Sequence, residues 1–384
     1  MRRFLTKPIL GGVAVLALLA GGGAYALFAG SPTPVPAAST PSPSATPSPT
    51  ARPTATPTQR PTPSPSPSPT PEPAAVCPLN GLPMADAELA DRTALVVQVE
   101  NHPDARPASN LNNADIVVEA PVEGDTTRFS AIFLCQPTEG LTGPARSARY
   151  YNVDLWQAMH LLTVGFGASD GSLARFADAG MPYINGITGA WPWFQRVGGR
   201  QAPHNLYADV EGIRAAMGQN AALDGAAAAA DDVRPPFEID PDAELPQGRT
   251  VDDITIATNS FWVFGWSWDE ALGGWRRSDS GIEISDAATD EVVNVRSVIV
   301  QRVTQEVVFG DPDPGGYPRR LQHLVGQGTG TAYVDGAAID IAWSRPSADA
   351  PTSWTVAGSG EALVLPPGRI WWEIIPVEAF LSES

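Results

Sequence analysis

The amino-acid sequence predicts an α+β body in two parts, an α/β domain over residues 77–220 followed by a mainly β domain over residues 250–384. The first part alternates short apolar runs with amphipathic, helix-like segments, which is typical of an α/β domain. In the second part the apolar period becomes two, so we expect a small sandwich or open barrel. Between them, residues 221–249 combine an alanine run with several prolines, which indicates a linker.

Apolar runs and helix caps give the order of elements in the first part. Buried strands are expected over residues 93–100, 115–119, 129–135 and 161–166. A polar side chain that can cap a helix precedes each expected helix, and these N-caps are Asn152, Ser172 and Asp209.

Four aromatic residues in the second part recur at period two and therefore share one face of a strand: Trp262, Phe264, Trp266 and Trp268. We expect this face to be buried in a sheet core, and the alternative is a platform on which glycan rings stack. Asp335-Gly336 predicts a tight turn between two further strands. The other strands of this part are expected over residues 292–300, 330–334, 339–343 and 370–374.

Residues 1–30 predict a single-pass membrane anchor. Arg2, Arg3 and Lys7 precede an uncharged stretch whose length is close to the ~20 residues that cross a bilayer. Because positive charges before a span stay inside, the rest of the chain would be extracytoplasmic. The alternative is a secreted protein whose signal peptide is cleaved near Ala26.

Residues 31–76 are almost only Pro, Ser, Thr and Ala, and such a segment cannot build a core. We expect a disordered stalk that carries the body through a cell wall. The formal net charge of −18 repels phosphate backbones, so nucleic-acid binding is not expected. The expected partners are the membrane, for the leader, and a cell-envelope polymer or an envelope protein, for the body.

The chain has two cysteines, Cys77 and Cys135. We expect them to form a disulfide, because the predicted location is oxidising. Such a bond would tie the start of the body to its sheet and stabilise it by roughly 3–4 kcal/mol. The alternative is a pair of buried free thiols.

Several short motifs resemble those of a known family. They are PLNGLP (78–83), ENHPDARP (100–107), ADIVVE (114–119), GPARSAR (143–149), APHNLY (202–207), WSWD (266–269) and GQG (326–328). Together they resemble the YerB-like family of bacterial lipoproteins (DUF3048), whose members pair an N-terminal with a C-terminal domain. The resemblance covers nearly all of residues 77–384 and implies no particular activity. The lipobox cysteine of a lipoprotein is absent, so the anchor would be peptide rather than lipid.

Charged loops beside the predicted strands form the candidate site of the first part. If strand ends bring these loops together, several arginines would line one cleft beside two histidines, which suits a phosphate or carboxylate ligand. The alternative is that ion pairs of Arg106, Arg128, Arg146 and Arg149 with Asp104, Asp115, Glu119 and Glu123 brace the fold. The candidate ligand-binding residues are Asn101, His102, Asp104, Arg106, Glu123, Thr127, Arg128, Arg146, Ser147, Arg149, His204 and Asn205.

Two constellations would instead support a cell-wall hydrolase or transferase. Glu119 and Glu123 could act as a general acid–base pair. Ser147 with His102 or His204 could form a nucleophile and its base. Neither has a diagnostic spacing, so these remain candidates, and a purely structural envelope scaffold is the third hypothesis. No cofactor is expected, and the four scattered histidines predict no metal site.

Overall fold

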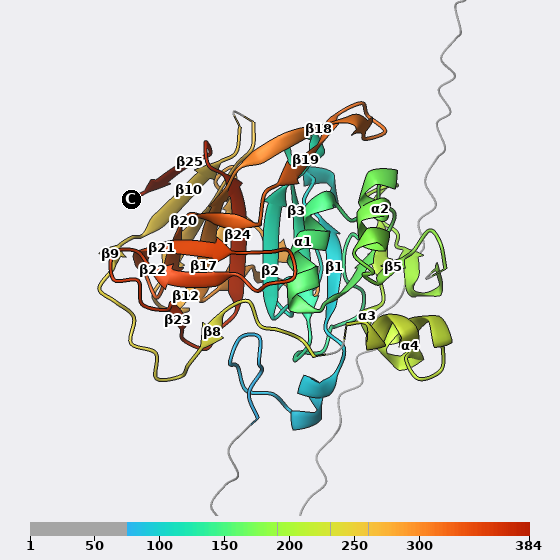
Figure 1. Ribbon diagram of the computed structural model, residues 1–384, viewed down its shortest axis with the longest axis horizontal. Coiled ribbons are helices and arrows are strands. Elements are labelled where there is room, and N and C mark those ends of the chain that lie inside the picture. The colour runs from blue at the N-terminus through green and yellow to red at the C-terminus, as the bar shows by residue number, and fades with distance from the viewer. Residues whose placement is uncertain (1–74, 190, 231, 260) are drawn as a thin grey trace, which may run out of the picture. The chain divides into compact units, whose positions relative to one another are not determined.

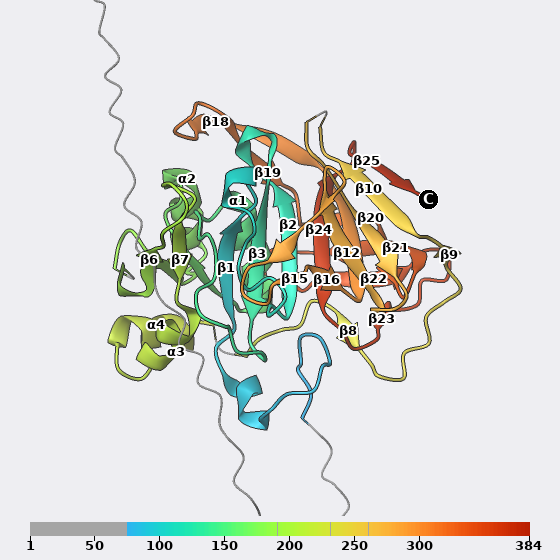
Figure 2. The same cartoon turned by 180° about the vertical axis from the view of Figure 1, so that it is seen from behind.

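The computed structural model describes residues 75–189, 191–230, 232–259 and 261–384 (Figures 1 and 2). The expected anchor at residues 1–30 and all but the last two residues of the expected stalk lie outside these ranges. No helix in the described ranges is long and apolar enough to span a membrane.

One long mixed sheet contains strands from both expected domains. Its strands are β1 (Leu95–Glu100), β2 (Ile116–Pro121), β3 (Thr127–Phe133), β4 (Leu162–Gly165), β5 (Tyr183–Asn185), β9 (Arg249–Thr250), β17 (Ser297–Val303), β20 (Gly326–Val334), β21 (Ala337–Arg345), β22 (Ser353–Val356) and β24 (Ile370–Pro376). Their order is β22–β21–β20–β17–β24–β2–β3–β1–β4–β5, with β9 also paired to β21. The parallel pairing of β2 with β24 joins the two halves of the sheet.

A second sheet covers one face of the C-terminal half. It consists of β10 (Asp253–Ala257), β11 (Val263–Asp269), β12 (Gly274–Asp279), β13 (Ile282–Glu283), β16 (Asn294–Val295) and β25 (Phe380–Glu383). Ile254 and Phe264 of this sheet share one buried cluster with Val298 and Trp371 of the long sheet. The two sheets therefore pack face to face as a sandwich.

The helices gather beside the N-terminal half of the long sheet (Figure 1). They are α1 (Tyr150–Met159), α2 (Asp170–Asp178), α3 (Val210–Ala216) and α4 (Ala221–Ala228), with 3-10 turns η1 (Ala87–Asp91), η2 (Pro103–Ala105), η3 (Glu123–Asp125) and η4 (Trp191–Trp193). Short ladders pair β6 (Phe194–Arg196) with β7 (Leu206–Ala208), β8 (Glu238–Ile239) with β23 (Val364–Leu365), β14 (Ser285–Asp286) with β15 (Glu291–Val292), and β18 (Gln305–Pro312) with β19 (Pro318–Gln322). The fold class is confirmed: an N-terminal α/β region is followed by a mainly β region.

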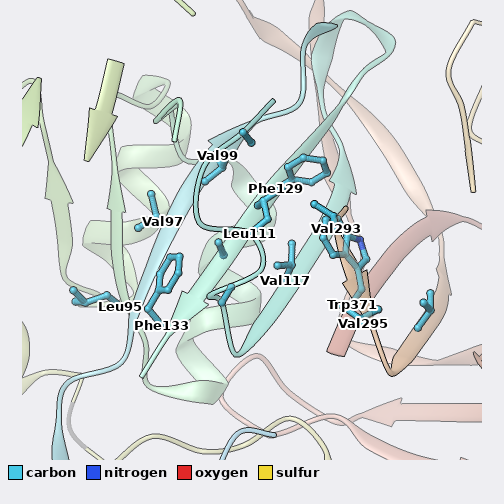
Figure 3. Packing of buried hydrophobic residues seen from close by; sticks show 14 of the residues in the cluster. Leu95, Val97, Val99, Leu111, Val117, Phe129, Phe133, Val293, Val295 and Trp371 are labelled. Atoms are coloured by element: carbon cyan, nitrogen blue, oxygen red, sulfur yellow. The ribbon is translucent and has the colours of Figure 1, made fainter. Parts of the chain in front are cut away.

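The long sheet is covered on both faces. Val97 and Val99 of β1 belong to one buried cluster, whereas Val96 belongs to the cluster on the opposite face. Figure 3 shows part of the first cluster, where β3 contributes Phe129 and β2 contributes Val117. Because both faces are covered, these strands are mostly apolar on both sides, and polar residues within them such as Gln98 and Ser130 are buried too.

The aromatic face of β11 belongs to the core. Phe264 and Trp266 are buried in the first cluster, and Trp262 and Trp268 pack against it. The prediction of a buried face is therefore confirmed. Burial of these rings against the long sheet explains the period of two, since alternate residues face the core.

Two predicted helix caps were wrong by a few residues. The first helix begins at Tyr150, so Arg149 is its N-cap, and the Asn152 side chain accepts a hydrogen bond from the Arg149 amide at 2.6 Å. The second helix is capped by Ser169, whose hydroxyl accepts from the Ser172 amide at 3.1 Å. In both cases a polar residue within the first turn was mistaken for the cap. The cap at Asp209 is confirmed.

The expected disulfide is confirmed, and part of the expected linker is helical. The alanine run within residues 221–249 forms α4, which Asn220 caps. Cys77 and Cys135 are bonded, with their Cα atoms 5.7 Å apart. The disulfide thereby fastens the start of the body to the segment that follows β3, as predicted.

Candidate functional site

A pocket of about 430 Å³ lies where β1 ends, β3 begins and α1 starts. Eight of the candidate ligand-binding residues line it: Asn101, His102, Glu123, Thr127, Arg128, Arg146, Ser147 and Arg149. Glu100, Gly124, Thr126, Asp313, Pro314 and Tyr317 complete the wall. The strand ends thus bring three separate charged loops together, although they lie up to about fifty residues apart in the sequence.

Two of the pocket arginines are neutralised by carboxylates of the same wall. Arg146 forms an ion pair with Glu100, and Arg149 forms one with Glu123. Burial raises the pKa of Glu123, but the charges of Arg149 and Arg128 outweigh burial and lower it to about 2. Glu123 is therefore ionised at neutral pH and holds no proton to donate.

Arg128 differs from its neighbours, because its guanidinium has no carboxylate partner in the described part of the chain. The residue is 6% exposed. Its Nη1 donates to the Ser147 carbonyl at 2.9 Å, and its Nε has no hydrogen-bond partner. Burial and the nearby charge of Arg149 lower the pKa of Arg128 to about 9, although Glu123 opposes them. The wall therefore holds a buried cation, still protonated at neutral pH, whose counter-charge is incomplete.

Ser147 and the two candidate histidines make separate contacts. Its Oγ donates to the Phe166 carbonyl at 3.0 Å, and among the described residues no histidine is hydrogen-bonded to it. His102 and His204 instead stack on each other, with ring centroids 4.9 Å apart. The structure thus does not assemble the nucleophile–base couple considered for Ser147.

Glu119 and Glu123 occupy different environments. Glu119 is sealed between the two sheets, where Arg277 donates to both of its carboxylate oxygens at 2.9 and 3.0 Å. Thr127 donates to the same carboxylate at 2.6 Å. Glu119 does not line the pocket, so the two glutamates do not face a common ligand.

Four candidate residues lie outside the pocket wall, and they are Asp104, Arg106, His204 and Asn205. Arg106 forms an ion pair with Asp279 at 2.7 Å, and its guanidinium lies 5.2 Å from the Trp262 ring. The Asn205 side chain accepts from Arg196 at 2.7 Å. Asp104 lies beside His102 rather than on the wall.

Ion pairs of the loop arginines do occur, as the bracing alternative expects, but most of their carboxylate partners differ from the expected ones. Arg149 pairs with Glu123 as considered, whereas Arg106 and Arg146 pair with Asp279 and Glu100. Asp115 pairs with none of these arginines. Its carboxylate accepts the Leu134 and Cys135 amides at 2.7 and 2.9 Å, and burial raises its pKa to about 6.

Sequence reasoning missed the contribution of the C-terminal region to the pocket. The turn between β18 and β19 supplies Asp313, Pro314 and Tyr317, and Arg319 of β19 reaches Glu123 at 3.2 Å. The run Asp-Pro-Asp-Pro-Gly-Gly indicated a turn, but nothing local in it points to a partner almost two hundred residues away.

The chain matches two models of one family. The model described as "Protein of unknown function (DUF3048) N-terminal domain" matches residues 79–223, and that described as its C-terminal domain matches residues 253–372. The first match includes β1 to β5, and the second includes β24 up to Trp372. In this chain the two matched regions thus share one sheet.

Relatives from Bacillus subtilis agree with these matches. "Putative lipoprotein YerB" of strain 168 is 28% identical over 300 residues, which are 78% of this chain and 86% of the relative. The crystal structure of the YerB protein from Bacillus subtilis is similar with a TM-score of 0.66 at 27% identity, covering 80% of this chain and 99% of that chain. The chain therefore belongs to the YerB-like DUF3048 family, whose function is unknown.

Proposed function

We propose that this protein is tethered to the membrane by its leader, with its body outside the cytoplasm, and that the arginine pocket binds an anionic cell-envelope ligand. The name of the Bacillus relative, a lipoprotein, supports a membrane-attached body. The Cys77–Cys135 disulfide supports an oxidising location. The chain has no further cysteine to carry a lipid, which supports a peptide anchor.

The observation that carries the binding proposal is the incomplete neutralisation of Arg128. A buried charge is costly unless it is paired, and folded proteins rarely leave a buried guanidinium without a counter-ion. Glu100 and Glu123 are already held by Arg146 and Arg149. An anion entering the pocket would complete the charge of Arg128 and the hydrogen bonding of its fork.

The size and polarity of the pocket limit the ligand class. A volume of about 430 Å³ is large enough for a phosphate or carboxylate together with part of the sugar or peptide that carries it. Arginine forks match both anions, since each offers two oxygens in a plane. We therefore propose wall polymers rich in phosphate or carboxylate as the ligands of the pocket.

Binding is favoured over catalysis by the state of the candidate catalytic groups. Glu119 is sealed away from the pocket, and Glu123 is held ionised by arginines. The Ser147 hydroxyl donates to a backbone carbonyl. Glu123 therefore holds no proton to give to a ligand at Arg128, and no described histidine is hydrogen-bonded to Ser147 as its base.

The test is a calorimetric titration of the full chain in detergent with inorganic phosphate, then with acetate, and then with purified wall polymers. Arg128→Gln is expected to weaken anion binding by about tenfold or more, because charge-assisted hydrogen bonds are lost. Arg249→Gln is the matched control, since Arg249 is half exposed and pairs with Asp340 and Glu383. Equal affinities of wild type and Arg128→Gln, or no binding by wild type, would reject the proposal.

A further inference from the structure

We propose a second site, for a divalent transition-metal ion, formed by His102, Asp104 and His204 at the edge of the arginine pocket. Each of these residues offers one ligand atom, and the three atoms lie within 4.8 Å of one another. Two imidazoles with one carboxylate are a ligand set typical of Zn²⁺ and of neighbouring first-row metals. The sequence gives no hint of this site, because the histidines are about a hundred residues apart and match no metal motif.

The backbone places both imidazoles. His102 follows β1 as the N-cap of η2, and its Nδ1 accepts the Asp104 amide at 3.2 Å, so this nitrogen carries a lone pair rather than a proton. Asp104 Oδ2 lies 3.7 Å from the same nitrogen. A metal ion bound there would replace one weak hydrogen bond.

The loop that carries His204 is fixed by its neighbour. The side-chain amide of Asn205 donates through Nδ2 to the backbone carbonyls of Val197 and Arg200 at 3.3 and 3.0 Å. The two imidazole planes differ by 22°, so the rings lie nearly parallel. The folded loops therefore place the two histidine rings against each other.

A separate observation points to a cation at this place. His204 Nδ1 lies 3.1 Å from Glu100 Oε1, yet this nitrogen makes no hydrogen bond to any of the residues that the structure describes. Glu100 is 4% exposed, and its Oε2 also lacks a partner. Buried polar atoms in native proteins rarely stay unsatisfied unless a water or an ion completes them.

Glu100 is counted as a neighbour and not as a ligand, because Arg146 already pairs with it. The three remaining ligands leave one tetrahedral position open, as in sites where water or an anion completes the coordination. Both Glu100 and His102 line the pocket, so the ion would lie next to the proposed anion site. The metal site does not depend on anion binding at Arg128.

The experiment titrates the full chain with Co²⁺, read by visible absorption, and with Zn²⁺, read by calorimetry, both without phosphate. Wild type is expected to bind one ion. His102→Ala and His204→Ala should each weaken binding by more than about tenfold, since even indirect supports of metal ligands matter that much. His323→Ala is the control, because His323 is an exposed histidine that contacts Glu306 elsewhere.

Absence of stoichiometric binding by wild type would overturn the proposal, and so would wild-type affinity in both histidine variants. Thermal melts establish that each variant is folded, and Asp104→Asn replaces any variant that is not. Metal binding is measured here without anion, and anion binding is measured above without metal. Failure of one proposal is therefore distinguishable from failure of the other.

Discussion

Two groups of charged residues on and around β2 and β3 differ in how their charges are balanced. Between the sheets, Arg277 is fully buried with Glu119 and lies 4.0 Å from Glu373. In the pocket, Arg128 is nearly as buried but contacts a carbonyl instead of a carboxylate. We call the first group (Glu119, Arg277 and Glu373) the sealed cluster.

The sealed cluster has both of its carboxylates near Arg277, although Glu373 Oε2 has no hydrogen-bond partner among the described residues. Trp371 donates to Glu119 at 3.2 Å, and Trp266 donates to Glu373 at 3.1 Å. Burial raises the pKa of Glu373, and the nearby charge of Glu119 raises it further, although Arg277 opposes both. Burial and Glu119 thus both favour the neutral form of Glu373, while Arg277 pairs with the Glu119 carboxylate.

The pocket differs, because Arg128 forms no ion pair with a carboxylate of the described residues. The comparison teaches that burial alone does not distinguish a structural charge from a functional one. What distinguishes them is whether the protein itself supplies the partner. The sealed cluster belongs to the architecture, since it links β2 and β24 of one sheet with β12 of the other.

The largest expected loss of stability results from a substitution in the sealed cluster. Arg277→Met should lower the free energy of unfolding by about 3–5 kcal/mol, because it leaves Glu119 buried without its counter-charge. Chemical denaturation of the full chain at neutral pH measures this loss. The double variant Arg277→Met with Glu119→Gln should recover part of it, since the unpaired charge is then removed. A single variant within about 1 kcal/mol of wild type would show that the cluster does not hold the sheets together.

The sequence predicts the individual strands well, but it does not predict which distant strands pair. Apolar runs located β1, β2 and β3, and the period of two located the core face of β11, because burial imposes these patterns locally. The parallel pairing of β2 with β24 has no local signal, as their residues are about 250 positions apart. The long sheet therefore contains strands from both regions that the sequence predicts as separate domains.

The candidate site shows the same division. The charged loops that follow strands were recognisable, because polar residues after a buried run lie at a sheet edge. The role of Glu119 was not recognisable, since its partner Arg277 lies 158 residues away. Spacing along one strand suggested a pair with Glu123, whereas tertiary packing gave each glutamate its own arginine.

A smaller loss of stability is expected for a substitution of Glu123, and this loss depends on pH. Its pKa in the folded protein is about 2, below the ordinary value of 4.5, so its stabilising effect is present above about pH 4.5 and is lost as the pH falls towards 2. Glu123→Gln should therefore be less stable than wild type by about 2 kcal/mol at pH 7, and the two should converge near pH 2.

Denaturation curves at several pH values give this comparison. Glu88→Gln is the control, because Glu88 is exposed in η1 and should show no such convergence. A stability difference between Glu123→Gln and wild type that stays constant from pH 7 to pH 2 would contradict the assigned ion pair with Arg149.

The smallest effect on stability is expected for a substitution of Arg128. This test distinguishes the charged residues of the pocket from the sealed cluster most clearly. Arg128→Gln removes a buried charge that has no partner, so the free energy of unfolding should change by less than about 1 kcal/mol. Phosphate should stabilise wild type in proportion to its binding, and it should stabilise the variant only at about tenfold higher concentration or more. A loss comparable to that of Arg277→Met would mean that Arg128 braces the fold, and the pocket would then join the sealed cluster as architecture.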